Sequence, residues 1–316
     1  MANLGLLPLR GNKSQGCQAF LTFIVPTTQC SLRCRFCFIR QRREALSTSL
    51  KPENYTKFIE EVARRLDIYG ISVQGYEPLL PESETYTQVI LSTAKALKVP
   101  SCLVTNGMDL RRCLPWLSEL SPDSLAVSLD ASCAEDHDRL RGAKGAWASA
   151  VDGAAAAVTA LPATQVAIAS VLIPGKTKYL EELPRLLKAI GITHWIVTPL
   201  YKVGATEPGG VAGDVRSLGR AFSRLEQLSD EFGIDLKLDD ELGLISDKFE
   251  FYGHDVDKNK IRRVPTGVKL IRLSPDGDVA ANEDILVRSG ATGCKWRPAV
   301  EAAGEFSDRV LKTVLN

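Results

Sequence analysis

Segments with the character of β-strands alternate six times with segments of helical character in residues 18–233. The expected strands are short and rich in β-branched residues, as in Ile168–Ile173 and Ile196–Thr198. This alternation is typical of parallel strands whose connecting helices cover the sheet from outside. Right-handed crossovers curl such a sheet in one direction, and six units fall short of the eight in a closed barrel. We therefore expect an α/β fold with a partial barrel.

The expected fold is a partial (βα)6 TIM-like barrel with an extension at each end. The strands are Phe20–Val25, Ile71–Gln74, Cys102–Thr105, Ser124–Leu129, Gln165–Ile173 and Trp195–Pro199. The N-terminal extension covers 1–17, the barrel 18–233 and the C-terminal extension 234–316. Within the last, Gly267–Leu273 and Val279–Ala281 should form a hairpin, because a turn with Pro and Gly joins them. The hairpin and the irregular segments around it should close the open side of the barrel.

Composition narrows the class of protein. The chain has 316 residues, 45% of them hydrophobic, which is enough for one large core. A net charge of +1 gives no sign of a nucleic-acid-binding surface, and no apolar run is long enough to span a membrane. Residues 1–16 are mixed and polar, so we expect no signal peptide. Unpaired cysteines favour a cytoplasmic, reducing location.

Three cysteines lie close together directly after the first expected strand. Cys30, Cys34 and Cys37 have the spacing C-x3-C-x2-C. Thiolates at this spacing can bind three irons of a [4Fe–4S] cluster, which normally has four cysteine ligands, so the fourth iron would be open to an outside ligand. A zinc site would need a fourth ligand, and the nearest candidates in sequence are Cys17 and Cys102. A disulfide would leave one thiol over.

Polar or backbone-exposing residues follow every expected strand. After the second, third and fourth strands come Gly75–Pro78, Thr105–Gly107 and Ser128–Asp130. The fifth strand ends near Ile173–Gly175, and the sixth ends at Thr198–Tyr201. In α/β barrels the reacting groups gather where the parallel strands end. The sequence therefore predicts a functional site at this edge of the sheet.

These motifs resemble those of the radical S-adenosylmethionine (SAM) enzymes. The cysteine loop resembles the cluster loop of that family, and Gly75–Pro78 resembles its Gly-Gly-Glu-Pro motif after the second strand. Ser128–Asp130, followed by His137–Gly142, looks like the fourth-strand region of the same family. The resemblance covers about residues 18–200.

The resemblance implies a mechanism. Cys30, Cys34 and Cys37 would bind a [4Fe–4S] cluster, and the amino and carboxylate groups of SAM would chelate its open iron. Reductive cleavage of SAM would give a 5′-deoxyadenosyl radical that abstracts hydrogen from a small-molecule substrate. A donor such as flavodoxin or ferredoxin would supply the electron.

The resemblance also implies which residues contact SAM. The Gly75–Glu77 edge would accept hydrogen bonds from the ammonium; Tyr76 replaces the family's second glycine there, and a positive φ would strain it. Arg141 would meet the carboxylate, where a guanidinium fork fits. The remaining expected contacts are Ser128 and Asp130 for the ribose, Phe38, Ile173 and Leu200 for the adenine, and Asn106 in the same shell.

A late cysteine indicates the type of reaction. A second cluster would need several further cysteines, and after residue 200 the chain has Cys294 alone. A thiol can return a hydrogen atom to a carbon radical, on the face opposite the abstracting group. Some epimerases of this family lack auxiliary clusters and use one such cysteine, and this chain resembles them in layout. We therefore expect an epimerase with Cys294 as donor, and Cys133, just past the fourth strand, as the alternative. The competing interpretation of Cys294 is a small apolar residue.

Other functions stay open at this point. The enzyme could be a dehydrogenase, dehydratase or decarboxylase in small-molecule biosynthesis, or could modify a peptide. A non-catalytic iron–sulfur or metal-binding scaffold would need the three cysteines alone. Asp239, Asp240 and Glu241 could bind an amino-bearing, aminosugar-like substrate, although a solvated acidic turn is the simpler interpretation.

Overall fold

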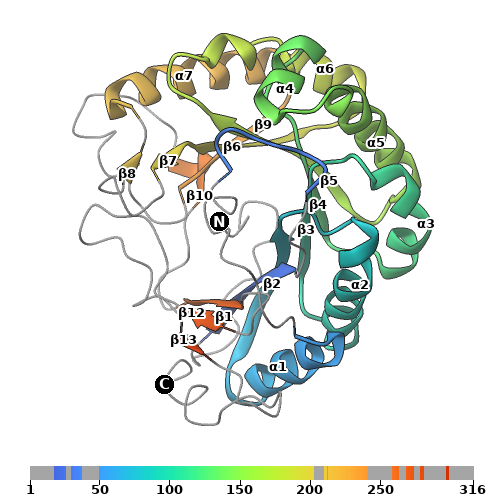
Figure 1. Cartoon of the computed structure of the whole chain (residues 1–316). Helices are drawn as coiled ribbons and strands as arrows, with labels where there is room; N and C mark the ends of the chain where they lie inside the picture. Colours follow the sequence, from blue (N-terminus) through green and yellow to red (C-terminus); the bar gives the residue numbers. More distant parts are fainter. Residues whose placement is uncertain are drawn as a thin grey trace.

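A large curled sheet with helices on its outer side forms the main part of the fold (Figure 1). The structure is a computed structural model of the whole chain. It describes residues 18–25, 30–37, 50–202, 210–211, 213–240, 258–262, 268–273, 278–280 and 297–298.

Eight parallel strands form the body of the sheet, in the order β9-β6-β5-β4-β3-β2-β1-β11. Their bounds are β1 Gln18–Val25, β2 Asp67–Gly75, β3 Ser101–Thr105, β4 Ser124–Ser128, β5 Gln165–Leu172, β6 His194–Pro199, β9 Asp235–Asp239 and β11 Val268–Leu273. Short strands extend both ends: β10 Ile261–Arg262 beside β9, and β12 Asp278–Ala280 and β13 Arg297–Pro298 beyond β11. A separate two-stranded sheet pairs β7 Tyr201–Lys202 with β8 Gly210–Val211.

Seven α-helices accompany these strands within the described residues. They are α1 Pro52–Arg65, α2 Pro81–Ala96, α3 Leu110–Leu120, α4 Ala134–Arg141, α5 Ala146–Ala160, α6 Leu183–Ala189 and α7 Val215–Phe232. Short 3-10 helices cover Thr177–Tyr179 and Lys258–Lys260. In the part of the chain that the structure describes, no helix combines the length and the hydropathy that a membrane span requires.

Capping residues define the ends of α4 and α7. Asp214 caps α7 by accepting hydrogen bonds from the N–H groups of Arg216 and Ser217. Gly142 ends α4 at φ 69°, ψ 29°, and Gly233 ends α7 at φ 68°, ψ 34°. Both glycines adopt the left-handed conformation that other residues rarely adopt. The two caps are thus nearly identical in backbone geometry.

The predicted partial α/β barrel is confirmed, with its six βα units in the expected order. The predicted hairpin is also present, since β11 pairs antiparallel with β12. Its first strand pairs parallel with β1 and so lengthens the sheet at that edge. Across the described ranges the strands at the two ends of the sheet do not pair with each other, so the sheet stays open.

A strand that the sequence analysis does not name follows residue 233. Strand β9 pairs parallel with β6, so the sheet continues past the predicted barrel boundary. Leu236 and Leu238 are buried in the core, and Asp239 and Asp240 at the end of the strand are buried as well, so they do not form a solvated turn. The alternating pattern of β9 is weak in sequence, because only Leu236 and Leu238 are apolar and the other positions are charged.

The two faces of the sheet are filled differently. A large core between sheet and helices contains bulky side chains such as Phe23, Phe58 and Trp195. The concave face carries a smaller cluster that includes Ala126 and Ala167. Phe20, Ile196 and Leu270 fill the same cluster beside these alanines, so small and large side chains together pack the inside of the curled sheet.

Replacing Leu238 by alanine tests the seventh strand of the curled sheet. We expect Leu238→Ala to lower the free energy of unfolding by about 2–4 kcal/mol, because the side chain is 1% exposed. The matched control on the same strand is Asp235→Ala, which removes a partly exposed ion pair with Lys237 and should cost less than about 1 kcal/mol. Equal costs in urea unfolding would contradict the assignment of β9.

Candidate functional site

The cysteine loop of residues 30–37 lies at the carboxyl end of β1. Cys30, Cys34 and Cys37 are half-buried free thiols. The Cys37 N–H donates to the Cys34 carbonyl at 3.3 Å, and the Leu32 N–H donates to Cys30 Sγ at 3.4 Å. Burial raises the pKa of Cys30 to about 11 and also raises that of Cys34. Both residues are therefore thiols unless a metal stabilises their thiolates.

Asn106 holds the loop from the end of β3. Its Nδ2 donates to Cys30 Sγ at 3.6 Å and to Ser31 Oγ at 3.2 Å, while its Oδ1 accepts from the Met108 N–H at 2.8 Å. The amide is thus fixed at both ends. The sequence places Asn106 in the SAM shell, and the structure places it against the first cysteine of the loop.

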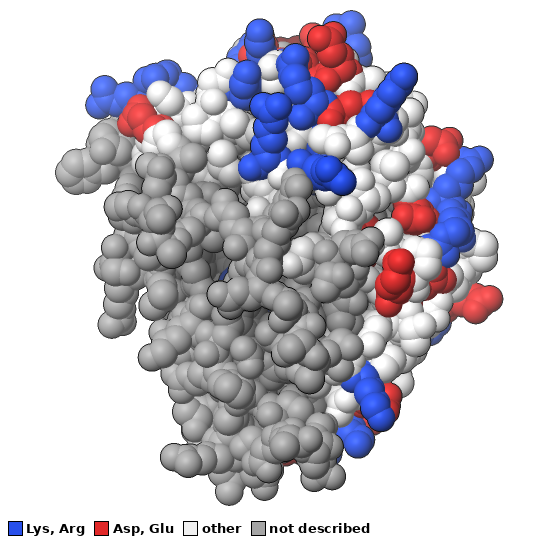
Figure 2. All heavy atoms as spheres, in the orientation of Figure 1, with Lys and Arg blue, Asp and Glu red and all other residues white. Residues whose placement is uncertain are grey.

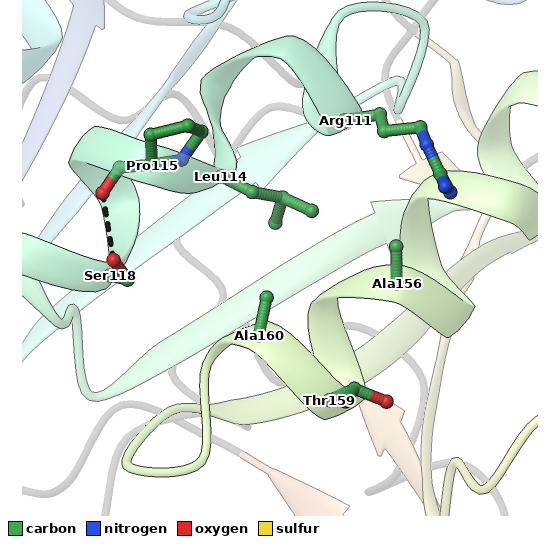
Figure 3. A pocket seen from close by; sticks show the side chains of 7 residues that line it. All are labelled: Arg111, Leu114, Pro115, Ser118, Ala156, Thr159 and Ala160. Atoms are coloured by element: carbon green, nitrogen blue, oxygen red, sulfur yellow. Dashed lines mark hydrogen bonds between the residues drawn. The ribbon is translucent and has the colours of Figure 1, made fainter.

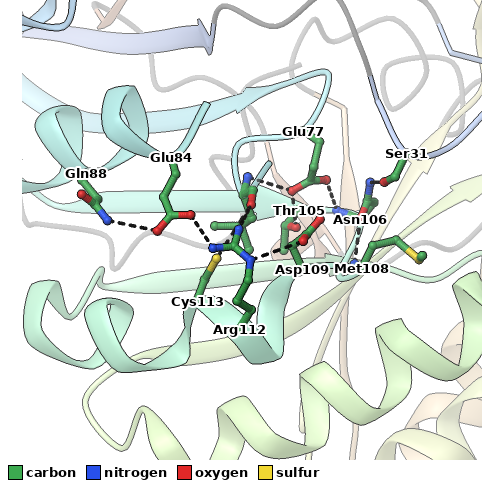
Figure 4. A network of polar contacts seen from close by, with 11 residues as sticks. Ser31, Glu77, Glu84, Gln88, Thr105, Asn106, Met108, Asp109, Arg112 and Cys113 are labelled. Carbon is green, nitrogen blue, oxygen red and sulfur yellow. Dashed lines mark hydrogen bonds and ion pairs between the residues drawn. The ribbon is translucent and has the colours of Figure 1, made fainter. Parts of the chain in front are cut away.

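Glu77 is buried and ties the end of β2 to the end of β3 (Figure 4). Its Oε1 accepts from Thr105 Oγ1 at 2.5 Å and from the Leu79 N–H at 3.1 Å, and its Oε2 accepts from the Asn106 N–H at 2.7 Å. Burial raises the pKa of Glu77 to about 7, although these hydrogen bonds act in the opposite direction. Both carboxylate oxygens are therefore used inside the protein.

A second part of the same network fixes the turn that follows Glu77. Arg112 on α3 donates to the Leu79 carbonyl at 2.7 Å and to Glu84 on α2 at 2.6 Å (Figure 4). Sequence reasoning missed Thr105 and Arg112 as contributors. Thr105 precedes Asn106 in the strand-end motif, and that position was the available signal.

Tyr76 is tolerated because the unusual backbone falls one residue earlier. Gly75 has φ +133°, and a Cβ there would lie 3.0 Å from the Ile24 side chain. Among the described residues, the positive φ values outside glycine belong to Lys98 and Ser121, so Tyr76 is not strained. Glycine is required at the first position of the motif and not at the second.

Arg141 holds the other side of the loop. Its Nε donates to Asp130 Oδ2 at 2.5 Å, and its Nη1 donates to Cys34 Sγ at 3.8 Å. The guanidinium also lies over the Phe36 ring, 5.3 Å from the centroid. Asp130 Oδ1 accepts from the Val171 N–H at 2.8 Å, so this carboxylate joins β5 to the end of α4. The ion pair is buried, and each charge has further polar partners.

The main chain of the loop caps α4. The Arg33 N–H donates to the Arg141 carbonyl at 2.8 Å, and the Arg35 N–H donates to the Leu140 carbonyl at 3.4 Å. The last carbonyls of a helix lack partners within the helix, so the loop satisfies them. A Cβ on Gly142 would lie 2.7 Å from the Arg33 carbonyl oxygen. This contact leaves no room for a side chain at the cap.

His137 supports Asp130 from within α4. Its Nδ1 accepts from the Asp130 N–H at 3.1 Å. Burial lowers the pKa of His137 to about 4, so the ring is neutral at neutral pH and its Nε2 carries the hydrogen. No hydrogen-bond partner for Nε2 occurs among the residues described.

The other predicted site residues lie in three different settings. Ser128, Ile173 and Leu200 are half-buried at or just after the ends of β4, β5 and β6. Cys133 is exposed at the start of α4, where its Sγ donates to Asp136 at 3.5 Å. Phe38, Glu241 and Cys294 lie outside the described residues.

The donor set of the loop fits a cubane cluster. No group of three or more His, Cys, Asp or Glu side chains in the described ranges is placed to hold one metal ion. A [4Fe–4S] cluster makes a different demand, because each cysteine binds a different iron and the sulfurs do not converge on one point. Three half-buried thiols on one loop, with N–H donors directed at two of them, match this demand.

A hollow on the outer surface is unrelated to this site. It lies between α3 and α5 and is lined by residues such as Arg111, Leu114, Ala156 and Thr159 (Figure 3). These side chains lie on the helical layer, whereas the cysteine loop follows the carboxyl end of β1. Its lining includes the hydroxyls of Ser118 and Thr159, but no histidine, cysteine or carboxylate that could activate them is among the lining residues that the structure describes.

Comparison with known proteins gives one family. The sequence model described as the Radical SAM superfamily matches residues 24–190. The FeMo cofactor biosynthesis protein NifB of Frankia alni is 27% identical over 223 residues, which cover 64% of this chain and 43% of that protein. The GTP 3′,8-cyclase of Corynebacterium glutamicum is 32% identical over 127 residues, covering 37% and 34%. The chain spans less than half the length of these relatives.

Solved structures share the fold. Streptococcus suis SuiB bound to S-adenosylmethionine matches with a TM-score of 0.65 at 15% identity, covering 94% of this chain and 65% of that chain. The structure of anSMEcpe with bound AdoMet matches with a TM-score of 0.57 at 15% identity, covering 86% and 76%.

Two glycine caps provide a matched test of how the loop is held. Gly142→Ala should lose most of the iron bound on anaerobic reconstitution, because the new Cβ would displace Arg33 and with it Cys34. Gly233→Ala introduces the same backbone strain at the end of α7, where nothing lies within 4 Å, and should bind iron like the parent protein.

Alkylation of the metal-free protein gives a second measurement. Cys34 should react with iodoacetamide several-fold faster in Gly142→Ala than in Gly233→Ala, because displacement of the loop exposes the thiol. Equal iron content and equal alkylation rates in the two variants would contradict the docking of the loop on α4.

Proposed function

The chain belongs to the radical SAM superfamily, and from this premise we propose that it cleaves SAM reductively and abstracts hydrogen from a small-molecule substrate. Members of the family use a [4Fe–4S] cluster and SAM. The observation that carries the proposal is the loop with Cys30, Cys34 and Cys37, held by Asn106 and Arg141 where parallel strands end. When bound, the cluster supplies the electron for SAM cleavage, and SAM supplies the radical.

The protein's own residues would position SAM beside the loop. Because both oxygens of Glu77 already accept hydrogen bonds, we assign the SAM ammonium to the backbone carbonyls of Gly75 and Tyr76. Arg141 uses Nε and Nη1 within the described residues, which leaves Nη2 for the SAM carboxylate. Each oxygen of Asp130 retains a lone pair for a ribose hydroxyl.

The remaining SAM contacts follow the strand ends. Ser128 would share the ribose with Asp130, and the half-buried side chains of Ile173 and Leu200 offer apolar surface for the adenine. Phe38 would contribute at the same level from just beyond the cysteine loop. These assignments place every part of SAM at the carboxyl edge of the sheet, as expected for a curled α/β sheet.

The reaction we favour is epimerisation with Cys294 as hydrogen donor. A thiol hydrogen is weakly bound and can be transferred to a substrate carbon radical, which inverts that carbon if the transfer occurs on the opposite face. Cys133 is the alternative donor, but its exposed place at the start of α4 supports this role less well. Dehydrogenation, dehydration or decarboxylation would need no such thiol.

We also propose an amino-bearing substrate of the aminosugar type. Asp239 and Asp240 are buried at the carboxyl end of β9, which supports a role in binding positive charge at the mouth of the sheet. A peptide substrate is the second candidate, because the similar protein SuiB has been solved bound to its precursor peptide SuiA. A cytoplasmic location and a flavodoxin or ferredoxin as electron donor complete the proposal.

Anaerobic reconstitution with iron and sulfide tests the proposed function. With SAM and dithionite, the reconstituted protein should release 5′-deoxyadenosine and methionine. Cys30→Ala, Cys34→Ala and Cys37→Ala should each abolish this release. A protein that binds a cluster but gives no 5′-deoxyadenosine under reducing conditions would instead be an iron–sulfur scaffold.

Replacing Cys294 by alanine separates the reaction types. For an epimerase, Cys294→Ala should still cleave SAM and abstract hydrogen but should no longer invert the substrate. In D2O the parent protein should place one solvent deuterium on the inverted carbon, as measured by mass spectrometry, with Cys133→Ala as the matched control. Unchanged turnover in Cys294→Ala would favour a dehydrogenase, dehydratase or decarboxylase.

A further inference from the structure

Positively charged side chains gather on the outside of α4 and the loop after β5. Figure 2 shows Lys and Arg side chains side by side where Figure 1 places these elements. Three cations of α4 and this loop surround Tyr179: Arg139, Lys176 and Lys178 lie 5.8, 5.1 and 5.9 Å from the ring centroid. Arg139 and Lys176 also donate to the Tyr179 hydroxyl, at 2.9 and 3.2 Å. One tyrosine thus organises three cations.

The cysteine loop extends this charge across the end of α4. Arg33 and Arg35 are exposed, and their main chain is bonded to the last carbonyls of the helix. Lys144 is exposed two residues after Gly142, whose Cα faces Arg33. We call Arg33, Arg35, Lys144, Lys176 and Lys178 the basic surface.

The neighbouring acidic residues do not neutralise the basic surface. Glu135 and Asp136 pair with Arg139. Asp138 accepts from the N–H groups of Gly145 and Trp147, at 2.6 and 2.8 Å. The five cations of the basic surface form no ion pair with a carboxylate in the described parts of the chain. Their charge is therefore presented to solvent.

The basic surface borders the site of the cluster. Arg33 and Arg35 flank Cys34 in the loop, and Cys34 and Cys37 are themselves half-buried. An electron that enters the cluster from this side would cross only the loop. The substrate, by contrast, approaches from the mouth of the sheet, where the strands end.

We propose that the basic surface is the docking site of an acidic electron-transfer protein that reduces the cluster. This inference rests on the proposed function, because only a redox cluster needs such a partner. Redox partners form small, transient interfaces, and complementary charge sets their rate of encounter more than their affinity. A flavoprotein with an acidic surface, such as a flavodoxin, has the matching chemistry.

The test compares a protein donor with a small one. In Lys176→Glu/Lys178→Glu, kcat/KM for reduced flavodoxin in SAM cleavage should fall by about tenfold at low salt, because steering is lost. The parent protein's rate should fall as NaCl rises, whereas the variant's rate should depend less on salt. With dithionite as reductant, both proteins should release 5′-deoxyadenosine at the same rate.

A matched variant controls for net charge. Lys57→Glu/Lys188→Glu changes the charge equally on exposed positions of α1 and α6 and should retain the parent's rate with flavodoxin. Equal flavodoxin-driven rates in all three proteins would overturn the docking site. An equal loss with dithionite would overturn it too, since the lysines would then serve SAM or an anionic substrate. If the parent itself releases no 5′-deoxyadenosine with dithionite, the proposed function fails instead.

Discussion

The contact between the end of α4 and the cysteine loop is the constraint on which the site depends. A helix carboxyl end carries partial negative charge, and three thiolates beside it would add to that charge. Two features offset this arrangement: loop N–H groups occupy the last carbonyls, and Arg141 lies between Asp130 and Cys34. The same contacts that complete the helix therefore also fix the position of the second cysteine.

The opposite side of the cysteine loop is held through the buried Glu77. Glu77 accepts three hydrogen bonds that lock the ends of β2 and β3, and Asn106 carries this rigidity to Cys30. Sequence similarity assigns this glutamate to the SAM ammonium, whereas here its carboxylate organises the protein. In the proposed function the SAM ammonium therefore contacts the main chain of Gly75 and Tyr76, whose geometry depends on a glycine at the first position.

Local sequence patterns predict most strands and helices of the fold. They do not predict the side-chain contacts of the site, because these join residues far apart in the sequence. Six βα units follow from apolar periodicity and turn residues, because each signal lies within one element. Strand β9 escapes this reasoning since two leucines among acidic residues make a weak pattern. The Asp130–Arg141 pair and the Glu77–Thr105 bond join residues 11 and 28 positions apart, and no spacing rule links them. Whether Tyr76 fits the motif without strain depends on the backbone conformation, in which the positive φ belongs to Gly75, and the sequence does not specify this.

The way α4 is capped determines which residues near the cysteine loop can change during evolution. Main-chain N–H groups of Arg33 and Arg35 complete the helix, so their side chains take no part in holding the cysteines. Evolution can therefore exchange residues 33 and 35 without moving the thiols of the cysteine loop. Gly142 has no such freedom, because its neighbour is a backbone oxygen that every amino acid carries. Lineages built on this scaffold should vary at the former positions and keep the latter.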